Sequence, residues 1–151
     1  MASPDIPPHF IFTIIVCFLR ECNDRKHFFT SVFRILGTAP LRYGVAHGLA
    51  MAVLLPHVMR QFGASAHKRL AELADVCGID GANEAEKANA FIRWIEETNA
   101  RMGLPDKFDI IREKDIDQMI TWAKKEANPL YPVPVVWGRK DFRRLIESIR
   151  K

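Results

Sequence analysis

Histidine is the residue type in this chain best suited to chemistry near neutral pH, because imidazole titrates there and binds borderline metal ions. The sequence has five histidines, at positions 9, 27, 47, 57 and 67. His47 and His57 stand ten residues apart in one apolar segment. On a helix this spacing rotates the two side chains by about 280° and separates them by about 15 Å. We therefore expect that they do not share a metal ion.

His47 has the most favourable position of the five, since Ala46-His47-Gly48 stands where an apolar helix is expected to begin. The positive end of a helix dipole opposes protonation of an imidazole, and a metal ion requires the neutral ring. A histidine that only hydrogen-bonds the first helical turn would suit the same position, so both interpretations stay open. His57, between Pro56 and Val58, is expected to be a hydrogen-bonded histidine of the core.

The glycines do not provide a phosphate-binding loop. They stand at positions 37, 44, 48, 63, 78, 81, 103 and 138, and no combination of them gives the G-x-G-x-x-G pattern. We therefore do not expect this chain to hold a dinucleotide by itself, and we assign no catalytic or cofactor-binding residues from the sequence.

The elements that position these residues are predicted to be helices, because apolar residues recur at spacings of three and four. The segment 47–60 is apolar nearly all round, which predicts a central buried helix with a kink or a break at Pro56. No alternating strand pattern stands out, and the proline-rich stretch 129–135 is expected to be an extended connector. The predicted class is an all-α helical bundle. The amphipathic stripes are Phe28, Phe29, Val32, Phe33 and Leu36; Leu70, Leu73, Ala74 and Cys77; Ala88, Phe91, Ile92, Ile95 and Met102; Ile116, Met119, Ile120 and Ala123; and Phe142, Leu145, Ile146 and Ile149.

The N-terminal apolar run 10–19 is about half the length that a membrane span requires. It lacks the positive flank and the small-residue cleavage site of a signal peptide. We expect a helix that is buried or covered by a partner, within a leader segment 1–30. The three cysteines, Cys17, Cys22 and Cys77, show no metal-like pairing, which favours a reducing, cytoplasmic compartment.

The formal net charge of +4 resides in the C-terminal segment. Residues 138–151 hold six basic and two acidic side chains, so the first 137 residues are neutral overall. This distribution argues against a nucleic-acid-binding surface across the fold. It leaves one basic helix that faces solvent, a partner or an acidic surface.

The run from Tyr43 to Arg60, YGVAHGLAMAVLLPHVMR, resembles the central motif of the iron-containing (group III) alcohol dehydrogenases. The later NPLYPVP at 128–134 and the helix that begins at Arg139 resemble the C-terminal end of the same family. The resemblance covers about residues 36–151. We therefore expect residues 31–151 to form a dehydroquinate synthase-like, alcohol dehydrogenase-type helical domain, with residues 1–30 unmatched and the family's nucleotide-binding domain absent.

The resemblance implies a metal, Fe(II) or Zn(II), and an NAD(P) cofactor, with the metal held by one aspartate and three histidines. His47 matches one of these ligands. A second ligand should stand fourteen residues before it, where this chain has Phe33, and a further histidine often found ten residues before it corresponds to Gly37. In the family, the metal polarises the alcohol or carbonyl oxygen while hydride passes to or from the nicotinamide.

Two hypotheses follow from these matches and departures. The first is the C-terminal domain of a metal-dependent, NAD(P)-linked alcohol dehydrogenase, inactive as an isolated chain and dependent on a separate nucleotide-binding half. The second is a non-catalytic helical fragment that self-associates or binds a protein partner, with the 10–19 helix covering the former interface. Nucleic acid is not an expected partner under either hypothesis.

Overall fold

The computed structural model describes residues 44–127 and 134–151. In these ranges every regular element is helical: α4 (His47–Phe62), α5 (Ala64–Val76), α6 (Glu84–Arg101), the short 3-10 helix η1 (Glu113–Asp115), α7 (Ile116–Ala127) and α8 (Arg139–Ser148). The predicted all-α class is confirmed. The predicted helices at 10–19 and 26–36, and most of the 129–135 connector, lie outside the described residues.

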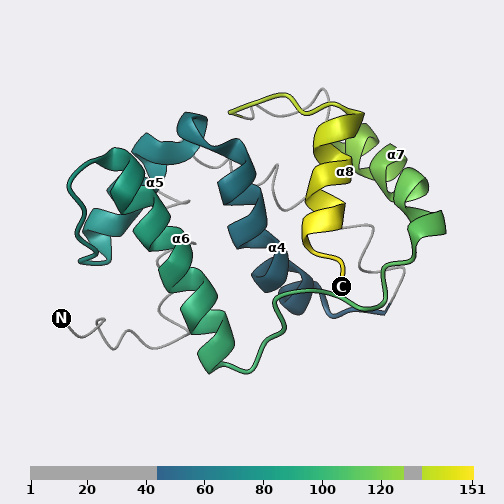
Figure 1. Cartoon of the computed structure of the whole chain (residues 1–151), viewed down its shortest axis with the longest axis horizontal. Coiled ribbons are helices and arrows are strands. Elements are labelled where there is room, and N and C mark those ends of the chain that lie inside the picture. The colour runs from purple at the N-terminus through teal and green to yellow at the C-terminus, as the bar shows by residue number, and fades with distance from the viewer. Residues whose placement is uncertain (1–43, 128–133) are drawn as a thin grey trace.

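Helix α4 lies between the other helices, with α5 and α6 on one side and α8 on the other (Figure 1). Buried side chains cover most of its circumference, as expected of a helix that is apolar nearly all round. They are Ala50, Met51, Val53, Leu54, Pro56, Val58, Met59 and Phe62. The helix ends at Gly63, whose φ of 53° and ψ of −137° are open essentially to glycine alone, and α5 begins at the next residue.

Helices α5 and α6 pack against each other through the stripes predicted from the sequence. Leu70, Leu73 and Ala74 of α5, with Cys77 just after its end, face Ala88, Phe91, Ile92 and Ile95 of α6, and all are buried. Met102, one residue beyond the end of α6, is the exception among the described stripe residues, because its side chain is 42% exposed. Lys87 and Asp75 add an ion pair between the two helices.

The start of α6 is closed by reciprocal hydrogen bonds. Asn83 Oδ1 accepts from the Glu86 amide at 2.9 Å, and Glu86 Oε2 accepts from the Ala82 amide at 3.0 Å. These bonds satisfy amides that have no partner within the helix.

Replacing this cap gives a direct test of its contribution. We expect Asn83→Ala to lower the free energy of unfolding by about 1 kcal/mol, because an amide of the first turn loses its acceptor. Asn83→Asp keeps an acceptor at the same place and should stay close to the wild-type value. Urea unfolding followed by circular dichroism measures both variants, and equal losses for Ala and Asp would contradict the role of the cap.

The C-terminal part of the fold joins η1, α7 and α8. Ile116, Met119, Ile120 and Ala123 are buried against Phe142, Leu145, Ile146 and Ile149, as the stripes predicted. The loop before η1 is tied to the chain end: the Phe108 amide donates to the Ile149 carbonyl at 2.7 Å, and the Lys151 amide donates to the Phe108 carbonyl at 3.0 Å. The ring of Trp137 lies between Phe62 and Phe142, with centroid distances of 4.8 and 5.6 Å, and so links α4 to α8.

The basic helix α8 faces an acidic surface of the same chain. Arg143 contacts Asp117 at 3.1 Å, and both Glu113 and Glu147 at 3.5 Å. Arg139 also pairs with Asp117, and Arg150 pairs with Glu113. These arginine side chains stay 33–55% exposed, so they meet solvent as well as acidic residues of the same chain.

We expect Arg143→Gln to lower the midpoint of thermal unfolding at low ionic strength. The difference should shrink in about 1 M NaCl, where screening acts over about 3 Å. Arg144→Gln is the matched control, because Arg144 is the next residue on the same helix and makes no ion pair to the described residues. Differential scanning calorimetry at two salt concentrations measures both, and a loss independent of salt would contradict an electrostatic origin.

No helix in the described part of the chain is long and apolar enough to cross a membrane.

Candidate functional site

The backbone at the start of α4 places His47 at the first helical position. Ala46 precedes it with φ −57° and ψ 132° and offers no side-chain oxygen to the first turn, which also contains no acidic residue. The positive end of the helix dipole therefore lies at His47 without a compensating charge from that turn. Nothing in the described chain lies within 4 Å of the place where a side chain at Gly48 would begin.

Midway along α4, Pro56 leaves a backbone carbonyl without its helical donor. Pro56 has no N–H, so the carbonyl of Ala52 cannot accept the usual bond from four residues ahead. Asn99 of α6 replaces that donor, with its Nδ2 2.7 Å from the Ala52 oxygen. The helix continues through Pro56 to Phe62, so the break that was one of the sequence expectations does not occur.

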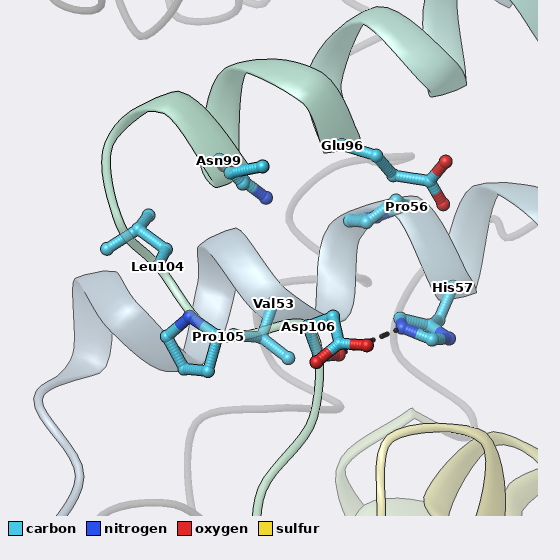
Figure 2. Close-up of a pocket in the computed structure, with 9 residues that line it drawn as sticks. Val53, Pro56, His57, Glu96, Asn99, Leu104, Pro105 and Asp106 are labelled. Carbon is cyan, nitrogen blue, oxygen red and sulfur yellow. Dashed lines mark hydrogen bonds between the residues drawn. The ribbon is translucent and has the colours of Figure 1, made fainter.

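A pocket of about 260 Å³ lies between this part of α4, the end of α6 and the loop that follows α6 (Figure 2). Apolar residues form much of its wall, and His57, Glu96, Asn99 and Asp106 add polar groups. The lining residues are Val53, Pro56, His57, Glu96, Asn99, Ala100, Leu104, Pro105 and Asp106.

His57 lies in the wall of this pocket. Its Nε2 is 3.4 Å from the Asp106 carbonyl oxygen, so this nitrogen carries the proton that the carbonyl accepts. The predicted hydrogen bond is confirmed, but the prediction of a core histidine is wrong, because the residue is only half-buried. Helix α4 leaves the imidazole at its edge, facing a loop whose position the local sequence did not reveal.

Burial lowers the pKa of His57, and this effect outweighs the Asp106 carbonyl and the Glu96 carboxylate, which raise it. The protonated ring is thus less favourable in the folded chain than in the unfolded chain. His57 should therefore reduce the free energy of unfolding as the pH falls below about 6.5, the ordinary histidine value. Above about pH 6.5 the ring is neutral in both the folded and the unfolded chain, so its titration does not change the free energy of unfolding.

The titration of His57 can be followed by NMR. We expect the ring Cε1–H signal, assigned by its loss in His57→Gln, to titrate with a midpoint below about 6.5. The same substitution should make the fall in stability between neutral and mildly acidic pH shallower. A midpoint at or above the ordinary value would show that the Asp106 and Glu96 interactions dominate over burial.

A metal ion needs about three or four protein ligands in sites of this kind. Across residues 44–127 and 134–151, no three His, Cys, Asp or Glu side chains are grouped so that they could hold one. The described residues alone therefore do not fit a complete metal centre. Phe33 and Gly37, where the resemblance implies histidines, lie outside the described residues, as do His9, His27, Cys17 and Cys22.

The pocket and its polar residues other than His57 were not found from the sequence. Asn99 carried a usable signal, since it follows Ile95 by four residues and so falls on the apolar stripe of α6. A polar residue on a buried face is expected to have a hydrogen-bond partner. Its partner is the Ala52 carbonyl, forty-seven residues away in the sequence, and no local pattern indicates that pairing.

Residues 31–149 match the Fe-containing alcohol dehydrogenase family, C-terminal. The chain therefore belongs to this family, and the match is to its C-terminal domain. The resemblance that the motif around His47 suggested is confirmed.

Individual relatives match shorter stretches. The chain is 33% identical to 1,3-propanediol dehydrogenase of Citrobacter freundii over 90 residues, 57% of this chain and 23% of that protein. It is 33% identical to lactaldehyde reductase of Escherichia coli K12 over 78 residues, covering 49% of this chain and 20% of that protein. It is 38% identical to 1-propanol dehydrogenase PduQ of Citrobacter freundii over 77 residues, covering 48% of this chain and 20% of that protein. The matched part thus spans less than a quarter of each relative's length.

A solved structure agrees with the fold. The crystal structure of a 1,3-propanediol oxidoreductase superposes with a TM-score of 0.69 at 23% identity, over 79% of this chain and 32% of that chain. The helical arrangement around α4 is therefore that of the C-terminal domain in this family.

Proposed function

We propose that this chain supplies the helical half of a metal-dependent, NAD(P)-linked alcohol dehydrogenase and does not transfer hydride by itself. The observation that carries this proposal is the family match across residues 31–149. The motif residue His47, at the first position of α4, is the metal ligand we propose. Phe33 and Gly37 stand where the family resemblance implies histidines, which supports the proposal that the chain does not transfer hydride by itself.

The substrates we propose are short-chain alcohols or aldehydes, because the relatives are named for 1,3-propanediol, lactaldehyde and 1-propanol. The partner we propose is a nucleotide-binding half, since the glycines of this chain form no dinucleotide loop. We further propose a cytoplasmic location, which the odd number of cysteines without metal-like spacing supports.

The absence of a three-ligand group among the described residues also favours a second candidate. In this alternative the chain is a non-catalytic helical domain that self-associates or binds a protein partner. Metal and nucleotide binding distinguish the two candidates.

The first experiment uses the chain alone, purified with Fe(II) or Zn(II) and titrated with NADH and NADPH. We expect far less than one metal ion per chain and no saturable nucleotide binding, because a single ligand does not retain such an ion. Metal in a one-to-one ratio, lost in His47→Ala, together with NAD(P)-dependent alcohol oxidation, would overturn the proposed lack of activity.

The second experiment supplies the missing half. The chain is co-expressed with the N-terminal domain of the Citrobacter freundii 1,3-propanediol dehydrogenase, with and without Phe33→His. We expect the restored histidine to raise metal retention at least about tenfold and His47→Ala to abolish the gain. His67→Ala is the matched control and should keep it. Failure of the restored chain to retain metal would favour the non-catalytic candidate.

A further inference from the structure

The two halves of α4 on either side of Pro56 are attached to their neighbours differently. In the C-terminal half, Arg60 donates to both Glu96 oxygens, at 3.1 and 2.5 Å, and Gln61 donates to the Asp141 carbonyl at 2.7 Å. In the N-terminal half, residues 47–55, the side-chain hydrogen bond from another described helix is the one from Asn99 to the Ala52 carbonyl.

Pro56 weakens the connection between these halves. It removes one helical hydrogen bond and its ring crowds the Ala52 carbonyl, which makes a proline the commonest site of helix bending. The apolar contacts of Ala50, Val53 and Leu54 hold the N-terminal half in the core, but such contacts are not directional. The pocket beside Val53 and Pro56 leaves space next to this point. The bond from Asn99 to the Ala52 carbonyl is a directional contact between this half and α6 at the turn that Pro56 weakens.

We propose that Asn99 is a positioning residue, whose hydrogen bond to the Ala52 carbonyl sets the direction of the His47 end of α4 relative to α6. In Figure 2 the Asn99 side chain points from α6 toward α4 on the side where Val53 and Pro56 lie. The relevance of this direction to metal binding rests on the proposed function. The direction itself is a property of the described chain and can be measured without metal or cofactor.

The experiment compares Asn99→Ala with Asn89→Ala, a matched control at an exposed position of the same helix, using the full chain. Residual dipolar couplings of the backbone amides report the orientation of the helix segment 49–55 relative to the segment 57–62 and to α6. Amide hydrogen exchange reports the protection of the same two halves. Both measurements separate a local change of direction from a general loss of stability.

For Asn99→Ala we expect altered couplings in residues 49–55 only, with protection there reduced about tenfold, the change that one hydrogen bond produces. Residues 57–62 and the Asn89→Ala control should keep wild-type values. Adding Pro56→Ala to Asn99→Ala should return the couplings and the protection of residues 49–55 to wild-type values. The reason is that the new amide at position 56 can donate to the Ala52 carbonyl. Unchanged couplings, equal loss in both halves, or no restoration would each overturn the proposal.

A comparison in the Pro56→Ala background tests the proposal even if Asn99→Ala alone does not fold. With the helical bond to Ala52 restored, removing Asn99 should leave the couplings of residues 49–55 unchanged. A change of direction in that background would show that Asn99 acts by another route and would overturn the assignment. The outcome is independent of metal binding, so a failure here differs from a failure of the proposed function.

Discussion

A helix that is apolar on nearly all sides has to be covered on nearly all sides, and α4 imposes this requirement on the described chain. Exposed apolar surface costs about 25 cal/mol for each Å². The stripes of α6 and α8 cover it from opposite directions, and Trp137 fills the space between Phe62 and Phe142. The surrounding helices can thus be understood as the cover that one buried segment requires.

This requirement also explains why polar groups near α4 are so specifically paired. A backbone carbonyl released by a proline beside a packed core is costly unless a donor reaches it. Asn99 supplies that donor from α6, while Arg60 and Glu96 form their ion pair at the more exposed edge of the same two helices. Helices α4 and α6 are therefore joined by a neutral hydrogen bond on the side near the core and by an ion pair on the side that water reaches.

The helices of this fold were predictable because their signal is local. The buried stripes of α5, α6, α7 and α8 follow from apolar spacing, apart from Met102, whose side chain just beyond α6 is exposed. The motif around His47 was equally legible, since it lies in one continuous run. The pocket, the half-buried state of His57 and the acidic partners of α8 were not predictable. Each depends on residues brought together from distant parts of the chain, such as His57 and Asp106.

The short pairing between Phe108 and residues 149–151 bears on how the chain reaches this fold. Bringing these two places together closes a loop that contains η1, α7 and α8. The entropy lost on closing a loop rises only slowly with its length, so one meeting of the two ends limits the freedom of all three elements at once. Their mutual contacts then form over shorter distances. The C-terminal region is in this way closed on itself at Phe108, in addition to its packing against α4 through Trp137 and α8.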